Sequence, residues 1–331
     1  MKKVIVVVIL IAVGFVACED KFDLKAPWKE VMSIYGLLDQ SQAVQYIKIN
    51  KAFLGDGNAT DIAQISDSSN YNPSDLEVKL QRMKNGAQIG ADILLSDTVL
   101  EDKRSGVFAS SNNIVYKTRD SLFNDSDYKL IVKNKKTGHE ATATTPLVGD
   151  FSVSLLANTV GFVVSPGVYS SFKVRWTSVA NAKIYQLKIR FNYTETEGQT
   201  VTNKSVDWVF GTQKIDKVKA GTEMYQEVSG TNFYQFLKSI KSVSFPSNTV
   251  VRTDGFLDFT VTCGGDELST YIDVTQPSSN INQEKPFYTN INNGIGIFSC
   301  RYVSNVVSKK LSANSLLELK IGQFTSDLNF Q

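Results

Sequence analysis

The chain has 331 residues, of which 42% are hydrophobic and 11% aromatic, so it can build packed cores and is not a disordered chain. Lysine and arginine number 35 against 33 acidic residues. The two signs are interspersed without a basic stripe, which argues against a nucleic-acid partner. One histidine and three cysteines leave few residues for a metal site or a histidine-based catalyst, so we predict neither a metal nor a cofactor.

Residues 1–17 have the pattern of a bacterial lipoprotein signal peptide. Two lysines precede an uncharged stretch from Val4 to Ala17, which is shorter than the roughly 20 residues that a membrane-spanning helix needs. It ends in a lipobox-like Phe-Val-Ala-Cys, in which Phe15 departs from the usual Leu or Val. By that likeness Cys18 is expected to become the N-terminus and to carry acyl chains such as palmitate. A plain secretory signal with an incidental cysteine is the alternative.

Three acidic residues, Glu19, Asp20 and Asp23, follow the predicted lipidation site in the tether of residues 18–29. This run resembles the export signal that sends Bacteroidetes lipoproteins to the outer face of the outer membrane, although an ordinary solvated tether has the same composition. We therefore expect an outer-membrane protein that is held by its N-terminal lipid, and the acidic run favours the cell exterior.

Alternating polar and apolar residues begin at residue 30 and predict strands. The first two cover residues 31–36 and 44–51, and a third covers residues 77–83. A hairpin from Tyr128 to Thr145 is typical of the closing strands of an immunoglobulin-like fold, so residues 30–147 are expected to form an N-terminal immunoglobulin-like β-sandwich.

A polar stretch over residues 55–75 separates the second predicted strand from the third. Its side chains Asp56, Asn58, Asp61 and Asp67 suggest a calcium loop. The glycine and the closing glutamate of an EF-hand loop are missing, so a solvated loop is the expectation.

A Pro and a Gly within residues 146–150 predict a boundary, after which residues 148–331 are expected to form a fibronectin-like C-terminal β domain. Residues 183–193 alternate strictly, and Trp176 is predicted to lie in the core. One helix is predicted near residues 232–242, where four apolar side chains share a face: Phe233, Phe236, Leu237 and Ile240. Residues 256–263 and 268–274 are predicted to pair as a hairpin. The expected fold is all-β, with two tandem sandwiches and one short helix.

Two cysteines remain in the mature chain, Cys263 and Cys300. Strand parity places each on an apolar face, so both are expected to point into a core. A compartment outside the inner membrane permits a disulfide between them. Two buried free thiols are the alternative, because the sequence does not fix the distance between the sulfur atoms.

Several segments together resemble the DUF4249 domain family of Bacteroidetes outer-membrane lipoproteins, a family of unknown function. They are the lipobox, the early strand pair with its Tyr35-Gly36-Leu37-Leu38, the Tyr128 hairpin, the Asn232-Phe233-Tyr234 helix and the late segment from Asn290 to Phe298. The resemblance spans nearly the whole mature chain and implies a two-part β-rich body. It also implies, by association, a TonB-dependent outer-membrane transporter as partner.

Three classes of function follow, and the first is a non-enzymatic surface lipoprotein that acts as a binding or accessory module beside such a transporter. The second is a surface glycan-binding protein, with stacking platforms among Trp28, Trp176, Trp208 and the tyrosines. The third, which we disfavour, is a paired-carboxylate hydrolase. The sole histidine, His139, falls in a predicted turn, no nucleophile or phosphate-loop motif is present, and two acids can meet from anywhere in a chain. The first acids to inspect are Asp254, Asp258, Asp266 and Glu267.

Overall fold

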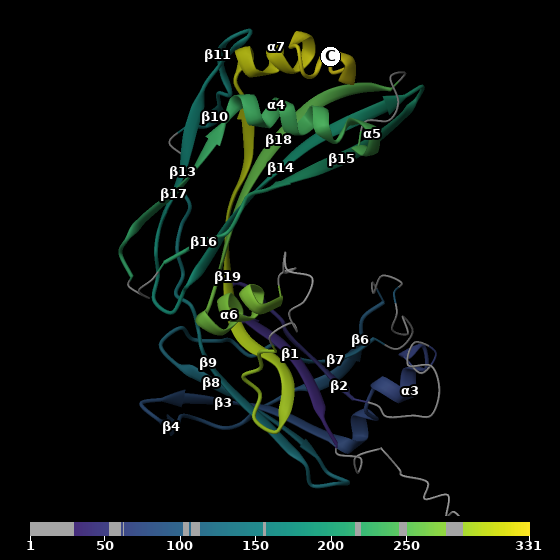
Figure 1. The fold of residues 1–331 in the computed structure, drawn as a ribbon, viewed down its shortest axis with the longest axis vertical. Helices are drawn as coiled ribbons and strands as arrows, with labels where there is room; N and C mark the ends of the chain where they lie inside the picture. Colours follow the sequence, from purple (N-terminus) through teal and green to yellow (C-terminus); the bar gives the residue numbers. More distant parts are fainter. Residues whose placement is uncertain are drawn as a thin grey trace, which may run out of the picture. The chain divides into compact units, whose positions relative to one another are not determined.

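The computed structural model describes residues 30–331 apart from eight gaps: 53–60, 62, 102–105, 107–112, 155–156, 216–219, 245–249 and 276–286. Val31–Gln331 form one compact unit, which is β-rich (Figure 1), as the alternation of polar and apolar residues predicted. The signal peptide and tether expected over residues 1–29 lie outside the described residues.

The described residues of the first half of this unit form nine strands. They are β1 (Met32–Asp39), β2 (Gln45–Lys51), β3 (Leu76–Lys84), β4 (Ala87–Gln88), β5 (Ile93–Leu94), β6 (Ser96–Val99), β7 (Ile114–Thr118), β8 (Asp127–Asn134) and β9 (Glu140–Pro146). A short helix α3 (Ser66–Ser69) and a 3-10 turn (Pro73–Asp75) lie between β2 and β3. The three strands and the closing hairpin predicted for this half are therefore confirmed.

In the second half, the part of the chain that the structure describes contains ten strands and four helices. They are β10 (Thr159–Val160), β11 (Val163–Ser165), β12 (Val168–Tyr169), β13 (Ser171–Thr177), β14 (Ile184–Glu197), β15 (Thr200–Val209), β16 (Gln213–Lys214), β17 (Glu223–Ser229), α4 (Gly230–Ser239), α5 (Lys241–Ser244), β18 (Val251–Gly264), α6 (Asp266–Thr275), β19 (Gly294–Leu311), α7 (Ala313–Ile321) and a 3-10 turn (Ser326–Leu328).

One ten-stranded sheet joins the two halves, in the order β15-β14-β18-β19-β1-β2-β7-β6, with β10 on β19 and β16 on β14. Strand β1 runs parallel to β19, with Met32 opposite Gly294 and Asp39 opposite Arg301. The boundary expected between residues 147 and 148 stays a prediction, and the sheet crosses it, because the first and the last strands of the unit are neighbours.

A second layer faces each part of the large sheet. The five-stranded sheet β4-β3-β8-β9, with β5 on β3, belongs to the first half. The pair β13-β17 belongs to the second half, where Trp176 lies 6.0 Å from Tyr185 of β14 and Phe172 lies 6.2 Å from Phe259 of β18, measured between ring centroids. Trp176 is 3% exposed, so its predicted place in the core is confirmed.

Both halves contain a buried tyrosine whose hydroxyl returns to the backbone just upstream. The Oη of Tyr128 accepts a hydrogen bond from the Phe123 N–H at 2.9 Å, and the Oη of Tyr185 accepts one from the Val179 N–H at 2.9 Å. This arrangement matches the tyrosine corner of immunoglobulin-like sandwiches. Burial raises the pKa of Tyr185 to about 12, so the hydroxyl keeps its proton.

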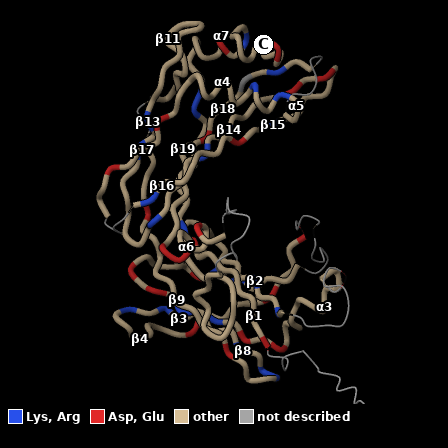
Figure 2. Tube along the Cα trace, in the orientation of Figure 1, with Lys and Arg blue, Asp and Glu red and all other residues tan. Residues whose placement is uncertain are grey.

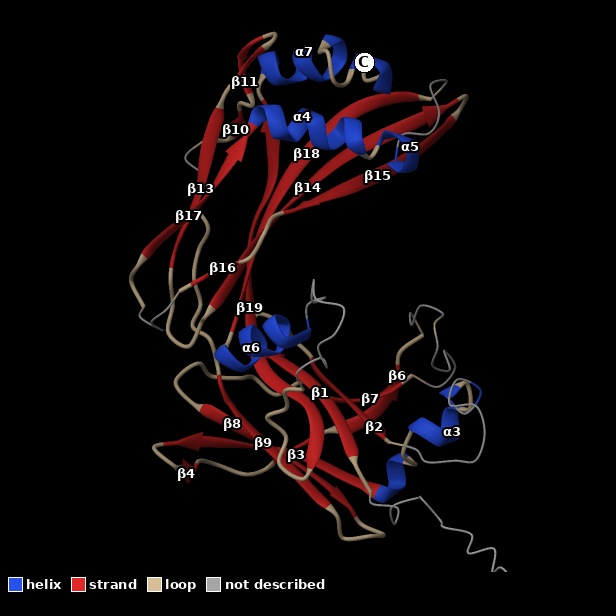
Figure 3. Ribbon diagram, in the orientation of Figure 1, coloured by secondary structure: helices blue, strands red, loops and turns tan. Residues whose placement is uncertain are grey.

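The predicted helix near residues 232–242 is confirmed as α4, which begins two residues earlier because Ser229 caps it through the Asn232 N–H. Its ring Phe233 packs on Phe191 of β14 at 5.8 Å between centroids, so α4 covers a face of the large sheet (Figure 3).

The predicted hairpin of residues 256–263 and 268–274 is wrong, because the second arm is helix α6. Leu268, Tyr271 and Ile272 fall at helical spacing, and Asp266 and Glu267 suit the positive N-terminal end of a helix. Strand β18 pairs instead with β14 and β19. Helix α7, which the sequence left unassigned, is capped by Ser312 through the Ser315 N–H.

Candidate functional site

The predicted lipidation site, Cys18, lies outside the described residues. Lipidation and the outer-membrane location therefore stay predictions. Among the residues that the structure does describe, no helix combines the length and the apolar character that a membrane crossing requires.

The candidate site is an open hollow of about 420 Å³ on the outward face of the large sheet. We call it the tyrosine shelf and define it by Tyr35 of β1, Tyr46 of β2, Tyr271 of α6, and the pair Asp39 and Arg301 at its rim. Apolar and polar neighbours complete its lining: Gly36, Leu37, Gln42, Val44, Gln45, Leu268 and Ile297.

Strand parity places the first two tyrosines outside. Ile34 of β1 and Ile47 of β2 are fully buried, whereas Tyr35 and Tyr46, each one residue away, are 43% and 42% exposed. Successive side chains of a strand point to opposite faces of the sheet, so the tyrosines share the face opposite the core. Large aromatic rings usually lie in the interior, so two neighbouring exposed rings mark this face as a place for contact.

Helix α6 supplies the third ring and one wall of the shelf. The Leu268 N–H donates to Ser299 Oγ at 3.2 Å, which fixes the first turn of α6 to β19. One turn later, Tyr271 lines the same hollow as Tyr35, and burial together with that neighbour raises the pKa of Tyr271. The two rings are thus held next to each other from elements far apart in the sequence.

The rim of the shelf is a fixed ion pair. Arg301 Nε donates to Asp39 Oδ2 at 3.1 Å, and Asp39 is 2% exposed. Asp39 Oδ1 also accepts from the backbone N–H of Ser41 at 3.0 Å and from its hydroxyl at 2.5 Å. Gln45 clamps the same turn, because its side chain bonds both the N–H and the carbonyl oxygen of Asp39 at 2.8 Å.

A second hollow of about 420 Å³ lies over residues 159–161 and β13. Its cations are already engaged: Lys173 Nζ lies 3.9 Å from the centroid of the Tyr225 ring, and Arg175 pairs with Glu223. Phe172 is its single aromatic lining residue. The tyrosine shelf, with three rings, is therefore the stronger candidate.

Of the tryptophans expected as stacking platforms, the two that the structure describes do not line the shelf. Trp28 lies outside the described residues. Trp176 is core, and Trp208 stacks on Phe236 of α4 with 5.7 Å between ring centroids. Tyr35 and Tyr46 were not predicted individually as site residues, although both occupy the polar parity of their predicted strands, which was the available signal.

His139 and Asp258 lie in other segments of the chain than Asp266 and Glu267, which are neighbours in the first turn of α6. His139 is in the turn between β8 and β9, where its Nε2 lies 2.8 Å from the carbonyl oxygen of Asn293. Six residues of β18 separate Asp258 from Gly264, so roughly 20 Å of strand lies between Asp258 and the acids of α6. Paired carboxylates of glycosidases lie within about 10 Å. The side chain of Asp254 is not among those described.

Asp258 and Glu267 have different surroundings. Asp258 accepts from the Asn192 amide at 2.9 Å and from the Ser308 N–H at 2.8 Å. Burial raises the pKa of Glu267, whose Oε2 is buried without a hydrogen-bond partner among the described residues.

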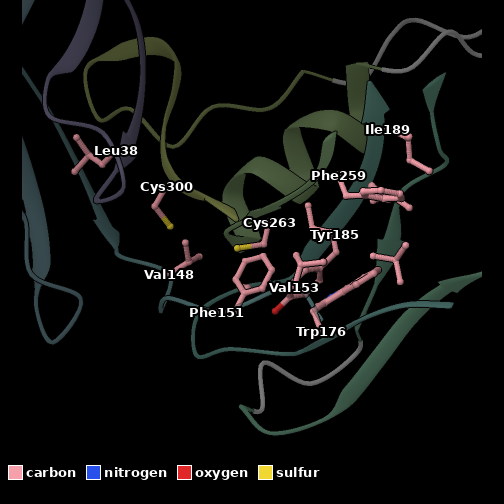
Figure 4. Packing of buried hydrophobic residues seen from close by; sticks show 14 of the residues in the cluster. Leu38, Val148, Phe151, Val153, Trp176, Tyr185, Ile189, Phe259, Cys263 and Cys300 are labelled. Carbon is pink, nitrogen blue, oxygen red and sulfur yellow. The ribbon is translucent and has the colours of Figure 1, made fainter. Parts of the chain in front are cut away.

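The two cysteines are buried free thiols in this structure. Cys263 lies opposite Tyr302, two residues along β19 from Cys300, so the cysteines are diagonal neighbours on one face. Figure 4 shows both sulfur atoms among the side chains of the buried cluster. Burial raises the pKa of each thiol to about 12, which keeps both protonated and unreactive.

Charged residues do not separate into large patches along the described chain (Figure 2). Among groups of histidine, cysteine and acidic side chains in the described residues, none has the arrangement of a metal site.

A comparison with protein-family models finds no match, and a comparison with curated proteins finds none either. Among solved structures, the C-terminal globular domain of an oligosaccharyltransferase from Pyrococcus abyssi is similar at 8% identity and a TM-score of 0.24, over 67% of this chain and 45% of that one. A cytokine receptor complex aligns at 10% identity and a TM-score of 0.21, over 86% of this chain and 100% of that one.

The N-terminal four immunoglobulin domains of Dscam1 align at 9% identity and a TM-score of 0.16, over 72% of this chain and 51% of that one. This chain thus spans less than half of the oligosaccharyltransferase domain and about half of the Dscam1 fragment. Likenesses at these scores carry no argument about function, which we derive from the chain's own residues.

Proposed function

We propose that this chain is a non-enzymatic surface lipoprotein that binds a glycan on the tyrosine shelf. The observation that carries the proposal is the grouping of Tyr35, Tyr46 and Tyr271 on one outward face, beside the fixed pair of Asp39 and Arg301. Lipidation at Cys18 is the expected means by which the body is kept at the membrane.

The chemistry of the shelf suits a sugar ring. A pyranose has an apolar C–H face that packs on an aromatic ring, and hydroxyl groups at its edge that need hydrogen-bond partners. Tyr46 and Tyr35 offer the first, while the Gln42 amide and the guanidinium of Arg301 offer the second. The shelf is rigid because its tyrosines lie on sheet strands and on a helix fixed to the sheet, so little ordering accompanies binding.

The test is retention on an oligosaccharide panel by the full chain in detergent. Tyr46→Ala is expected to weaken binding about tenfold, because an exposed aromatic platform is removed while the buried face of β2 is untouched. Tyr225→Ala is the matched control, since Tyr225 of β17 is 45% exposed, against 42% for Tyr46, and does not line the tyrosine shelf. Retention on no glycan, or equal loss in both variants, contradicts the proposal.

Membership of the DUF4249 family and association with a TonB-dependent transporter are proposals that rest on the resemblance. Affinity purification from detergent-solubilised outer membrane tests the second, with a transporter in equal amount as the expected result. Cys18→Ser tests the anchor, because loss of the acyl chains should release the protein from the membrane fraction. A variant that stays membrane-bound contradicts lipidation as the anchor.

A further inference from the structure

The guanidinium of Arg301 is positioned but only partly used. Its Nε is bonded to Asp39, and its two terminal nitrogens have no hydrogen-bond partner among the described residues. The Arg301 side chain is 43% exposed, whereas that of Asp39 is 2% exposed. A buried, hydrogen-bonded carboxylate therefore holds the planar group in the lining of the shelf and leaves its terminal donors available to a ligand.

This arrangement favours a planar anion. The terminal nitrogens of a guanidinium match the two oxygens of a carboxylate in a bidentate pair, which is stronger and more directional than a neutral hydrogen bond. Neutral hydroxyl groups need only single donors, so a fixed arginine at the edge of an aromatic platform is better suited to a charged ligand group.

Two lysines near the tyrosines also favour a negatively charged ligand. Lys48 lies opposite Tyr35 and Lys117 lies opposite Tyr46, so both lysines share the outward face with the tyrosines. Lys48 Nζ donates to the Ile114 carbonyl at 2.8 Å, and Lys117 Nζ donates to Thr98 Oγ1 at 3.3 Å.

The acids near the shelf are few. Asp39 is buried beneath the rim and already satisfied, while Asp266 and Glu267 lie in the first turn of α6. Glu267 directs its Oε2 into a buried position near Gly265. Lys48, Lys117 and Arg301 therefore share the outward face with the tyrosines, while Asp39 is buried and paired with Arg301.

We propose that the ligand of the tyrosine shelf is an acidic sugar, a pyranose that carries a carboxylate. The ring would lie on Tyr46 and Tyr35, and the carboxylate would meet the terminal nitrogens of Arg301. This inference rests on the proposed glycan function and adds the charge of the ligand. The volume of about 420 Å³ is within the roughly 300–1,000 Å³ of small-ligand sites.

The experiment compares two probes with one backbone: an oligosaccharide of galacturonic acid and its methyl ester, which keeps the ring and removes the charge. Calorimetric titration of the full chain in detergent is expected to show the acid binding about tenfold more tightly than the ester. Added salt is expected to weaken binding of the acid and leave the ester unchanged.

Three variants separate the steps. Arg301→Lys keeps a cation for Asp39 but removes the two terminal guanidinium nitrogens that form a bidentate pair. It should therefore bring the affinity for the acid close to that for the ester. Arg175→Lys is the matched control, with a side chain 41% exposed and paired to Glu223, and should change neither affinity. Tyr46→Ala should weaken both probes.

The outcomes are distinguishable. Equal affinity for acid and ester, with both weakened by Tyr46→Ala, overturns the acidic ligand and leaves glycan binding standing. An acid preference that survives Arg301→Lys unchanged overturns the bidentate role of the Arg301 guanidinium. Binding that Tyr46→Ala does not weaken, or retention of no sugar on the wider panel, overturns the shelf as a glycan site altogether.

Discussion

Replacing Gly296 by alanine tests the parallel contact between β1 and β19 that joins the two halves. Gly296 has a φ of +108°, and a Cβ added there would lie 2.0 Å from the carbonyl oxygen of Ile34 on β1. The oxygen belongs to the backbone of a paired strand, so relief requires the two strands to separate along part of their ladder.

The expected loss of stability has two causes, the positive φ of Gly296 and the overlap of the added Cβ with Ile34. A non-glycine residue in such a backbone conformation costs about 1–3 kcal/mol. The overlap with Ile34 adds the partial loss of the parallel ladder, so we expect Gly296→Ala to lower the free energy of unfolding by at least about 3 kcal/mol. Within the Gly-Ile-Gly segment of residues 294–296, the structure shows positive φ at Gly296 and not at Gly294.

Two control glycines separate strain from overlap. Gly86 has a φ of +79° with no atom within 4 Å of an added Cβ, so Gly86→Ala should cost only about 1 kcal/mol. Gly211 has open space and no positive φ, so Gly211→Ala should stay within about 0.5 kcal/mol. Urea unfolding followed by tryptophan fluorescence measures all three. If Gly296→Ala costs no more than Gly86→Ala, the close parallel contact is wrong.

Three further predictions follow from buried groups. Tyr128→Phe and Tyr185→Phe should each lower the free energy of unfolding by about 1 kcal/mol in urea titrations, because each removes one hydrogen bond to the backbone, and unchanged midpoints would contradict the tyrosine corners. Burial raises the pKa of Glu267 in the folded state, so the folded chain binds more protons than the unfolded chain, and the free energy of unfolding should fall as pH rises from about 4 through that pKa. Glu267→Gln should remove this pH dependence and raise stability at neutral pH. The same slope of stability against pH in both proteins would contradict the burial of the Glu267 carboxyl. Cys263 and Cys300 should resist iodoacetamide in the native state and react in urea, as mapped by mass spectrometry, whereas native labelling would contradict their burial.

Local patterns in the sequence were sufficient for most strands and for α4. In β14 the alternate residues from Tyr185 to Tyr193 are buried, as their period of two predicted. The helical spacing of Phe233 and Leu237 predicted α4, and both are buried. These features depend on neighbours within a few residues, because the direction of a side chain is set by the backbone repeat.

Pairing between distant segments was not accessible in the same way. Residues 268–274 carry both a period of two and a helical spacing, and only packing against β19 decides for α6. Likewise, nothing near Met32 specifies Gly294 as its partner. Such contacts depend on which surfaces the whole chain buries, and this is not a local property.

The sequence by itself determined a β-rich, charge-balanced body and a predicted anchor at Cys18, because composition and short-range periodicity carry that information. The grouping of residues in the candidate site depends on the tertiary structure. Parity separates Tyr35 from Ile34 and places it on the polar face of β1, but it does not say which other segments meet on that face. The tertiary structure decides this, because the five-stranded sheet covers the other face and α6 brings Tyr271 to the face of Tyr35 and Tyr46.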